Sequence, residues 1–94
     1  MESDPVIRRN DRAAFRELTE KEGGVLLHLD SGAYHGLNPM GTLIWNLIGE
    51  GSKLSALVGA VRARLADPPP DLQADVEAFI EDLAERDLLT LSAE

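Results

Sequence analysis

The sequence contains no cysteine and few aromatic residues. The missing thiols exclude disulfides, thiolate metal ligands and cysteine nucleophiles, and they are compatible with a reducing cytoplasm. No apolar run approaches the roughly 20 residues that a membrane-spanning helix needs, and the first residues lack the apolar core of a signal peptide. We therefore expect a cytoplasmic protein that does not enter a membrane.

The chain has 94 residues, of which 28% are charged and 44% are apolar. This balance is typical of one ordinary folded domain, and the length leaves no room for a cofactor-binding half beside a substrate half. We expect no cofactor. With so few large side chains, the core must depend on Leu, Ile, Val and Ala.

The net charge of −8 is concentrated near the C-terminus. Residues 71–94 carry one basic residue, Arg86, against eight acidic residues, which gives −7. Such a segment is repelled by phosphates, whose neutralisation supplies most of the affinity for nucleic acids. We therefore expect no nucleic-acid partner, and the plain alternative is that these acids form a solvated helix face.

The first half of the chain has the pattern of a small antiparallel sheet. Residues 1–12 lack periodicity and are interpreted as a flexible lead-in, followed by a single domain over residues 13–91. Short extended segments are expected within 13–19, at 25–29 and at 33–37, where Asp30-Ser31-Gly32 forms a hairpin loop. Val25, Leu27 and Leu29 share one face of their strand. In this meander the segment 33–37 is an edge strand.

The second half has the pattern of three helices. Asn38-Pro39 is a start signal, because Asn38 can cap the first turn and Pro39 has no N–H to satisfy. Ser52 is expected to cap a second helix, and Asp71 opens a third that lasts to about Asp87. The fold class predicted is α+β, with a three-stranded antiparallel sheet followed by three α-helices in a winged helix-turn-helix-like arrangement.

The sequence offers little for catalysis. His28 and His35 are the only side chains that titrate near neutral pH, and neither has a nucleophile or further metal ligands nearby in the sequence. The carboxylates of the last helix lie on an open face, where burial cannot tune them. We therefore predict no catalytic residues and no metal site: the protein is not an enzyme.

Residues 23–48 read GGVLLHLDSGAYHGLNPMGTLIWNLI. This stretch resembles the family of pyrroloquinoline quinone biosynthesis protein D (PqqD), the recognition element of ribosomally made, modified peptides. The shared features are a strand ending in Asp, a Gly turn, an aromatic residue, Leu-Asn-x-x-Gly and a helix with Ile-Trp. A second block near the C-terminus, Asp75-Val76, Phe79 and Leu83, is similar to the same family. The stretch around Gly41 looks most like the stand-alone members of lasso-peptide biosynthesis. Asp87 departs from the pattern, because the family commonly has glycine there.

The resemblance implies a winged-helix-like domain that binds the leader of a precursor peptide as an added strand, in the cleft between the edge strand and the third helix. It also implies a separate enzyme that receives the precursor, by analogy a leader protease and a cyclase. The candidate peptide-binding residues are Ala33, Tyr34, His35, Gly36 and Leu37 on the strand and Asp75, Val76, Phe79, Asp82, Leu83 and Arg86 on the helix.

Several of these roles have alternatives. Val76, Phe79 and Leu83 are either the floor of the peptide pocket or plain core. Asp75 or Asp82 either pairs with a basic leader residue or a backbone N–H, or is a solvated acid. Tyr34 lies on the opposite strand face from His35, and Trp45 is expected to cover the helix–sheet junction. A winged-helix DNA-binding regulator and an adaptor that activates a partner enzyme remain the alternative functions.

Overall fold

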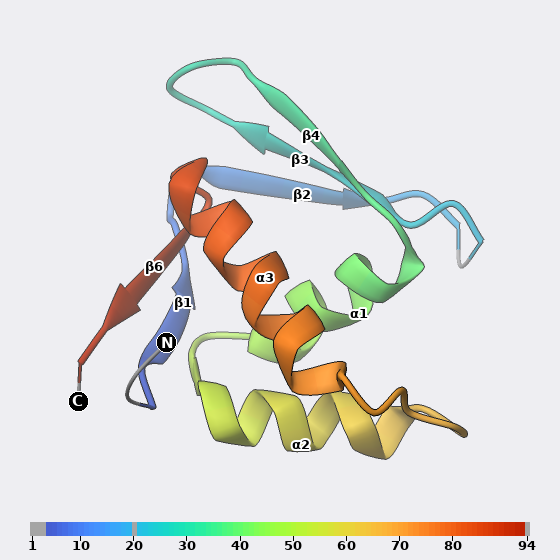
Figure 1. Ribbon diagram of the computed structural model, residues 1–94. Helices are drawn as coiled ribbons and strands as arrows, with labels where there is room; N and C mark the ends of the chain where they lie inside the picture. Colours follow the sequence, from blue (N-terminus) through green and yellow to red (C-terminus); the bar gives the residue numbers. More distant parts are fainter. Residues whose placement is uncertain (1–3, 20, 94) are drawn as a thin grey trace.

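The computed structural model describes residues 4–19 and 21–93. Within them, two antiparallel sheets of three strands each pack with three helices (Figure 1). The elements are β1 (Val6–Arg9), β2 (Ala13–Glu17), β3 (Gly24–His28), β4 (Tyr34–Leu37), α1 (Pro39–Ile48), β5 (Ser52–Lys53), α2 (Leu54–Arg64), α3 (Leu72–Glu85) and β6 (Leu89–Ser92). The α+β class is confirmed.

The predicted meander is the sheet β2-β3-β4. Its register places Leu27 of β3 between Ala14 of β2 and Tyr34 of β4. Alternate residues of β3 face the helices, and Leu26 is fully buried there. Among the described residues β4 pairs with β3 alone, so the predicted edge strand is also confirmed.

A second sheet, β5-β1-β6, lies beside the meander and corrects one prediction. Residues 6–9, assigned to a flexible lead-in, form the central strand of this sheet, and Ile7 is fully buried. Val6 pairs with both Lys53 and Ser92. Because both partners are distant in sequence, a four-residue segment without visible alternation gave no local sign of them. Residues 1–3 of the predicted lead-in lie outside the described residues.

The helix starts are capped in two different ways. Asn38 caps α1 as expected, with its Oδ1 accepting a hydrogen bond from the Gly41 N–H at 2.7 Å. The prediction that Ser52 caps α2 is wrong, because Ser52 belongs to β5 and α2 begins after Lys53. Instead the Asp4 carboxylate accepts from Ser55 N–H at 2.8 Å and from Ser55 Oγ at 2.6 Å. These hydrogen bonds lower the pKa of Asp4.

Trp45 of α1 is almost fully buried, at the junction of the helix with the two sheets. Its ring lies 6.0 Å from that of Phe15 in β2, and the Arg9 guanidinium sits 4.9 Å from its centroid. Arg9 Nη2 also donates to the Trp45 carbonyl at 2.7 Å, and burial lowers the pKa of Arg9. Trp45 therefore covers the helix–sheet junction, as the sequence predicts.

Helix length sets one limit on the fold. In residues 4–19 and 21–93, every helix is too short or too polar to pass through a membrane.

Candidate functional site

The outer edge of β4 carries main-chain groups that no other strand of residues 4–19 and 21–93 pairs with. His28 N–H donates to the Ala33 carbonyl at 2.9 Å, which makes these two residues a hydrogen-bonded pair. In an antiparallel ladder such pairs alternate, so His35 and Leu37 also bond to β3. Tyr34 and Gly36 then direct their N–H and C=O groups away from the sheet. They present four backbone groups to a guest strand.

One hollow lies at the start of β4, with a volume of about 200 Å³. It is lined by His28, Ala33, Tyr34, His35, Arg86 and Leu88. Asp82 of α3 contacts two residues that line this hollow. Its Oδ2 lies 3.7 Å from His35 Nε2, and its Oδ1 lies 3.2 Å from Arg86 Nε. The strand and the end of α3 therefore meet through a small polar cluster of His35, Asp82 and Arg86.

A second hollow of about 210 Å³ lies beyond the other end of β4. It forms between the first turns of α1 and α3, and its lining includes Met40, Gly41, Asp75, Val76 and Phe79. A Cβ atom on Gly41 would come within 2.9 Å of Phe79 Cε1, so the aromatic ring packs closely over this glycine. We call the open edge of β4 and the two hollows together the β4–α3 groove.

The structure brings most of the candidate residues to this groove. Ala33, Tyr34, His35 and Arg86 line the first hollow, and Asp75, Val76 and Phe79 line the second. Gly36 lies on the open edge, and Asp82 lies in the polar cluster with His35 and Arg86.

Three candidates belong to the core. Val76 is fully buried, although it also lines the second hollow. Leu37 is 4% exposed and Leu83 is fully buried, and neither lines a hollow of the groove. For Leu83 the core alternative is therefore the correct one, and the side chain of Leu37 also faces the helix–sheet interior.

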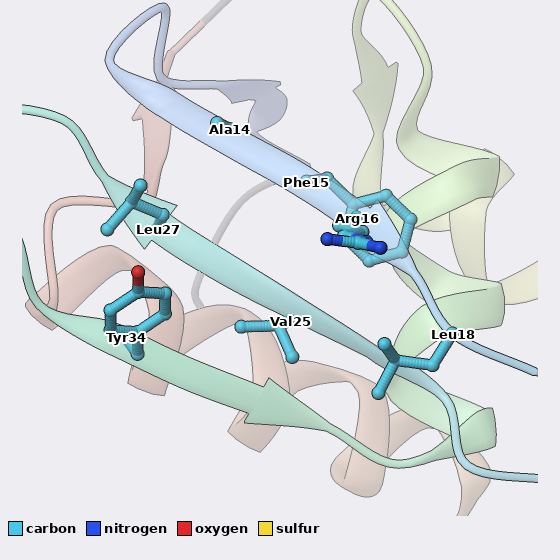
Figure 2. Close-up of a pocket in the computed structure, with 7 residues that line it drawn as sticks. All are labelled: Ala14, Phe15, Arg16, Leu18, Val25, Leu27 and Tyr34. Carbon is cyan, nitrogen blue, oxygen red and sulfur yellow. The ribbon is translucent and has the colours of Figure 1, made fainter.

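A third hollow, of about 380 Å³, lies on the face of the meander that is turned away from the helices. Figure 2 shows Val25 and Leu27 of β3 beside Tyr34 of β4 and Arg16 of β2 on this face. Tyr34 is 73% exposed, and Leu18 and Leu29 are about half exposed. We call this surface the outer sheet face.

The sequence predicted the shared side of Val25, Leu27 and Leu29 correctly but did not identify it as a surface site. The missed signal is the nearly continuous apolar run of β3, which is typical of a strand covered on both faces. In this chain only one of those faces is covered by helices.

The sequence profile of a known family, described as coenzyme PQQ synthesis protein D (PqqD), matches residues 23–89. The chain belongs to the PqqD family. The matched range includes β3, β4 and all three helices, and therefore both sides of the β4–α3 groove. No curated protein sequence matches the chain.

Two solved structures are similar to this PqqD-family chain. One, described as TbiB1 in complex with the TbiA(beta) leader peptide, is 31% identical, covers 93% of this chain and 99% of its own, and has a TM-score of 0.78. The other is described as lasso peptide synthetase B1 complexed with the leader peptide. It is 21% identical over 89% of this chain and 96% of its own, with a TM-score of 0.73, and supports the fold.

Proposed function

We propose that this chain is a non-catalytic recognition element that binds the leader of a ribosomally synthesised precursor peptide. The leader adds as a strand to the open edge of β4, and the domain presents it to a separate leader protease or cyclase of the lasso type. The observation that carries the proposal is the unpaired edge at Tyr34 and Gly36, flanked by a hollow at each end. A relative 31% identical to this chain is described in complex with a leader peptide, which supports the same occupant here.

The energetics require the hollows as well as the edge. Four backbone hydrogen bonds contribute about 2–6 kcal/mol net, at roughly 0.5–1.5 kcal/mol each. A micromolar complex needs about 8 kcal/mol, so backbone pairing alone is too weak. One apolar side chain buried in each hollow adds about 1.5–3 kcal/mol, so anchors in both hollows are needed to reach that value and to offset the cost of ordering the leader. Phe79 is the aromatic contact for the anchor in the second hollow.

The charges at the two ends of the groove differ. Asp82 already pairs with Arg86 and lies close to His35, so its carboxylate is engaged within the domain. Asp75 is exposed at the rim of the second hollow. Of the two acids considered from the sequence, Asp75 is therefore the better partner for a basic leader residue.

The outer sheet face is the surface that we assign to the maturation enzyme. A leader strand added to β4 would widen this face by one strand, and alternate leader side chains would lie beside Tyr34. Of the described residues that line the hollow there, Arg16 alone is charged. A partner with an apolar patch and one acidic residue would complement it. Because the precursor is made by ribosomes, we place this encounter in the cytoplasm.

A titration followed by NMR tests the proposal. The ligands are two synthetic peptides, the leader of the precursor encoded beside this chain and the TbiA(beta) leader. We expect the cognate leader to shift the backbone amides of residues 33–37 and 75–86. The proposal fails if the cognate leader does not bind, or if it binds while only amides outside these ranges shift.

Phe79→Ala supplies a second readout. The substitution removes the aromatic contact of the second hollow and should weaken leader binding about tenfold while the domain stays folded. Unfolding of the variant would assign Phe79 to the core, and the titration of the wild-type chain would then decide the function.

A further inference from the structure

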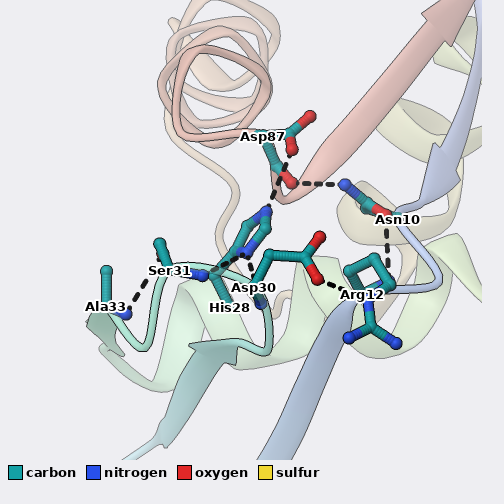
Figure 3. Close-up of polar contacts among 7 residues, drawn as sticks. All are labelled: Asn10, Arg12, His28, Asp30, Ser31, Ala33 and Asp87. Carbon is teal, nitrogen blue, oxygen red and sulfur yellow. Dashed lines mark hydrogen bonds and ion pairs between the residues drawn. The ribbon is translucent and has the colours of Figure 1, made fainter.

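His28, the last residue of β3, has a ring that joins two parts of the chain. Its side chain is 9% exposed and lies between the hairpin loop before β4 and the turn after α3. On the loop side, His28 Nδ1 lies 3.2 Å from Asp30 N and 3.4 Å from Ser31 N. On the turn side, His28 Nε2 lies 3.0 Å from Asp87 Oδ2 (Figure 3).

These contacts specify the tautomer of the ring. Two backbone N–H groups point at Nδ1, so Nδ1 must be the unprotonated acceptor. Nε2 then carries the hydrogen and donates it to the Asp87 carboxylate, which makes a hydrogen bond with an ionised acceptor. The neutral ring thus holds the loop with one nitrogen and the turn with the other.

Asp87 adopts a backbone conformation that disfavours side chains. Its φ is +61°, and among the described residues it is the only one other than glycine with a positive φ. Glycine reaches this conformation without steric cost, whereas an aspartate is tolerated at a cost. The Asp87 carbonyl accepts a hydrogen bond from Asn10 Nδ2 at 2.6 Å, but a glycine would keep that main-chain contact. A glycine at this position would lose only the hydrogen bond between the Asp87 carboxylate and His28 Nε2.

We propose that the His28–Asp87 hydrogen bond is a clasp that positions the start of β4 against the end of α3, and that it sets the width of the first hollow for the leader. Asp87 follows Arg86, which lines that hollow, and His28 lines it directly. On the other side, the loop held by Nδ1 leads through Ala33 into Tyr34. Asp87 is a positioning residue here, and the inference rests on the proposed leader-binding function.

The loop has its own contacts that transmit this position to β4. Ser31 Oγ accepts from Ala33 N–H at 3.2 Å, and the Ala33 carbonyl accepts from His28 N–H at 2.9 Å. Arg12 Nε lies 2.9 Å from Asp30 Oδ1. A shift of the His28 ring would therefore move the residues that begin the open edge, whereas the far end of β4 is held by its own pairing with β3.

The test compares Asp87→Gly, Asp87→Asn and the wild-type chain. Asp87→Gly relieves the left-handed backbone and removes only the clasp, so we expect a melting temperature near that of the wild type but leader binding weakened about three- to tenfold. Asp87→Asn tolerates the same φ and keeps an acceptor oxygen for Nε2–H, so it should retain wild-type affinity. Affinity is measured by fluorescence anisotropy with a labelled synthetic copy of the leader encoded beside this chain.

Val58→Ala is the matched control. Val58 is buried on α2, which lines neither hollow of the groove, so this variant loses stability without touching the clasp. In the absence of leader, Asp87→Gly should shift the amide resonances of Ala33, Tyr34 and Arg86, whereas Val58→Ala should leave them in place.

Each outcome decides the inference. Unchanged affinity of Asp87→Gly overturns the clasp while leaving leader binding intact. If Asp87→Gly loses leader affinity only in proportion to its lost stability, as Val58→Ala does, then Asp87 is a structural residue. That result also overturns the clasp. A wild-type chain that does not bind the leader overturns the proposed function, and the clasp with it.

Discussion

Replacing Gly36 with proline should block strand addition without unfolding the domain. The N–H of Gly36 points away from β3, and proline is tolerated in sheets where the missing N–H faces solvent at an edge. Gly36 is not among the residues with positive φ, so its backbone has the sign of φ that proline requires. The preceding residue, His35, is already extended, as a residue before proline prefers.

The structure sets the size of the effect. Proline removes one of the four outward groups, and its ring holds the guest strand too far away for the Gly36 carbonyl to bond well. Loss of these two hydrogen bonds costs about 1–3 kcal/mol, which weakens leader binding roughly 5- to 150-fold. The matched control is Gly36→Ala, because a Cβ at this position meets no atom within 4 Å and the N–H remains.

The assay is fluorescence anisotropy with the labelled leader, and thermal melting by circular dichroism reports the fold. We expect Gly36→Ala to bind like the wild type and Gly36→Pro to bind much more weakly at a similar melting temperature. A folded Gly36→Pro variant with wild-type affinity would refute pairing at this edge.

Three further predictions address the groove and the scaffold. Gly41→Ala brings a methyl group within 2.9 Å of Phe79 Cε1, so the ring must move into the second hollow. Leader affinity should fall about threefold to tenfold. The higher helix propensity of alanine stabilises α1 by up to about 1 kcal/mol, which keeps the melting temperature near that of the wild type. Asp4→Ala should lower the melting temperature at pH 7, because hydrogen bonds from Ser55 lower the pKa of Asp4. This stabilisation is present above the ordinary pKa of 3.8 and is lost as the pH falls through the lower pKa of the folded state. The melting temperatures of variant and wild type should therefore converge below pH 3.8. Gly23→Ala places a side chain at a φ of +87°, and its Cβ would overlap the β4 backbone. It should lower the free energy of unfolding in urea by about 2 kcal/mol or more. An unchanged midpoint of urea unfolding would contradict the close packing of this turn.

The sequence predicted those parts of the fold whose signals are local. Asn38-Pro39 marked the start of α1 because a capping side chain and a proline act within one turn. The hairpin around Gly32 marked β3 and β4, and the order of the segments placed β4 at the edge. Membership in the PqqD family was also accessible, because it depends on motifs with fixed spacing.

The signals that were missed are long-range. β1 gave no local sign of its role, since its partners Ser52–Lys53 and Leu89–Ser92 come together only when the chain is folded. The cap of α2 was missed for the same reason, because Asp4 reaches Ser55 from the other end of the chain.

For the candidate site, the sequence by itself determined which strand is open and which residue types lie along α3, because strand order and helical spacing follow from local pattern. The tertiary structure alone decided that Leu83 belongs to the core, that Asp82 lies 3.7 Å from His35, and that His28 meets Asp87. The physical reason is that burial and ionic pairing depend on how a strand and a helix far apart in sequence are oriented when they pack, and no local pattern fixes that orientation.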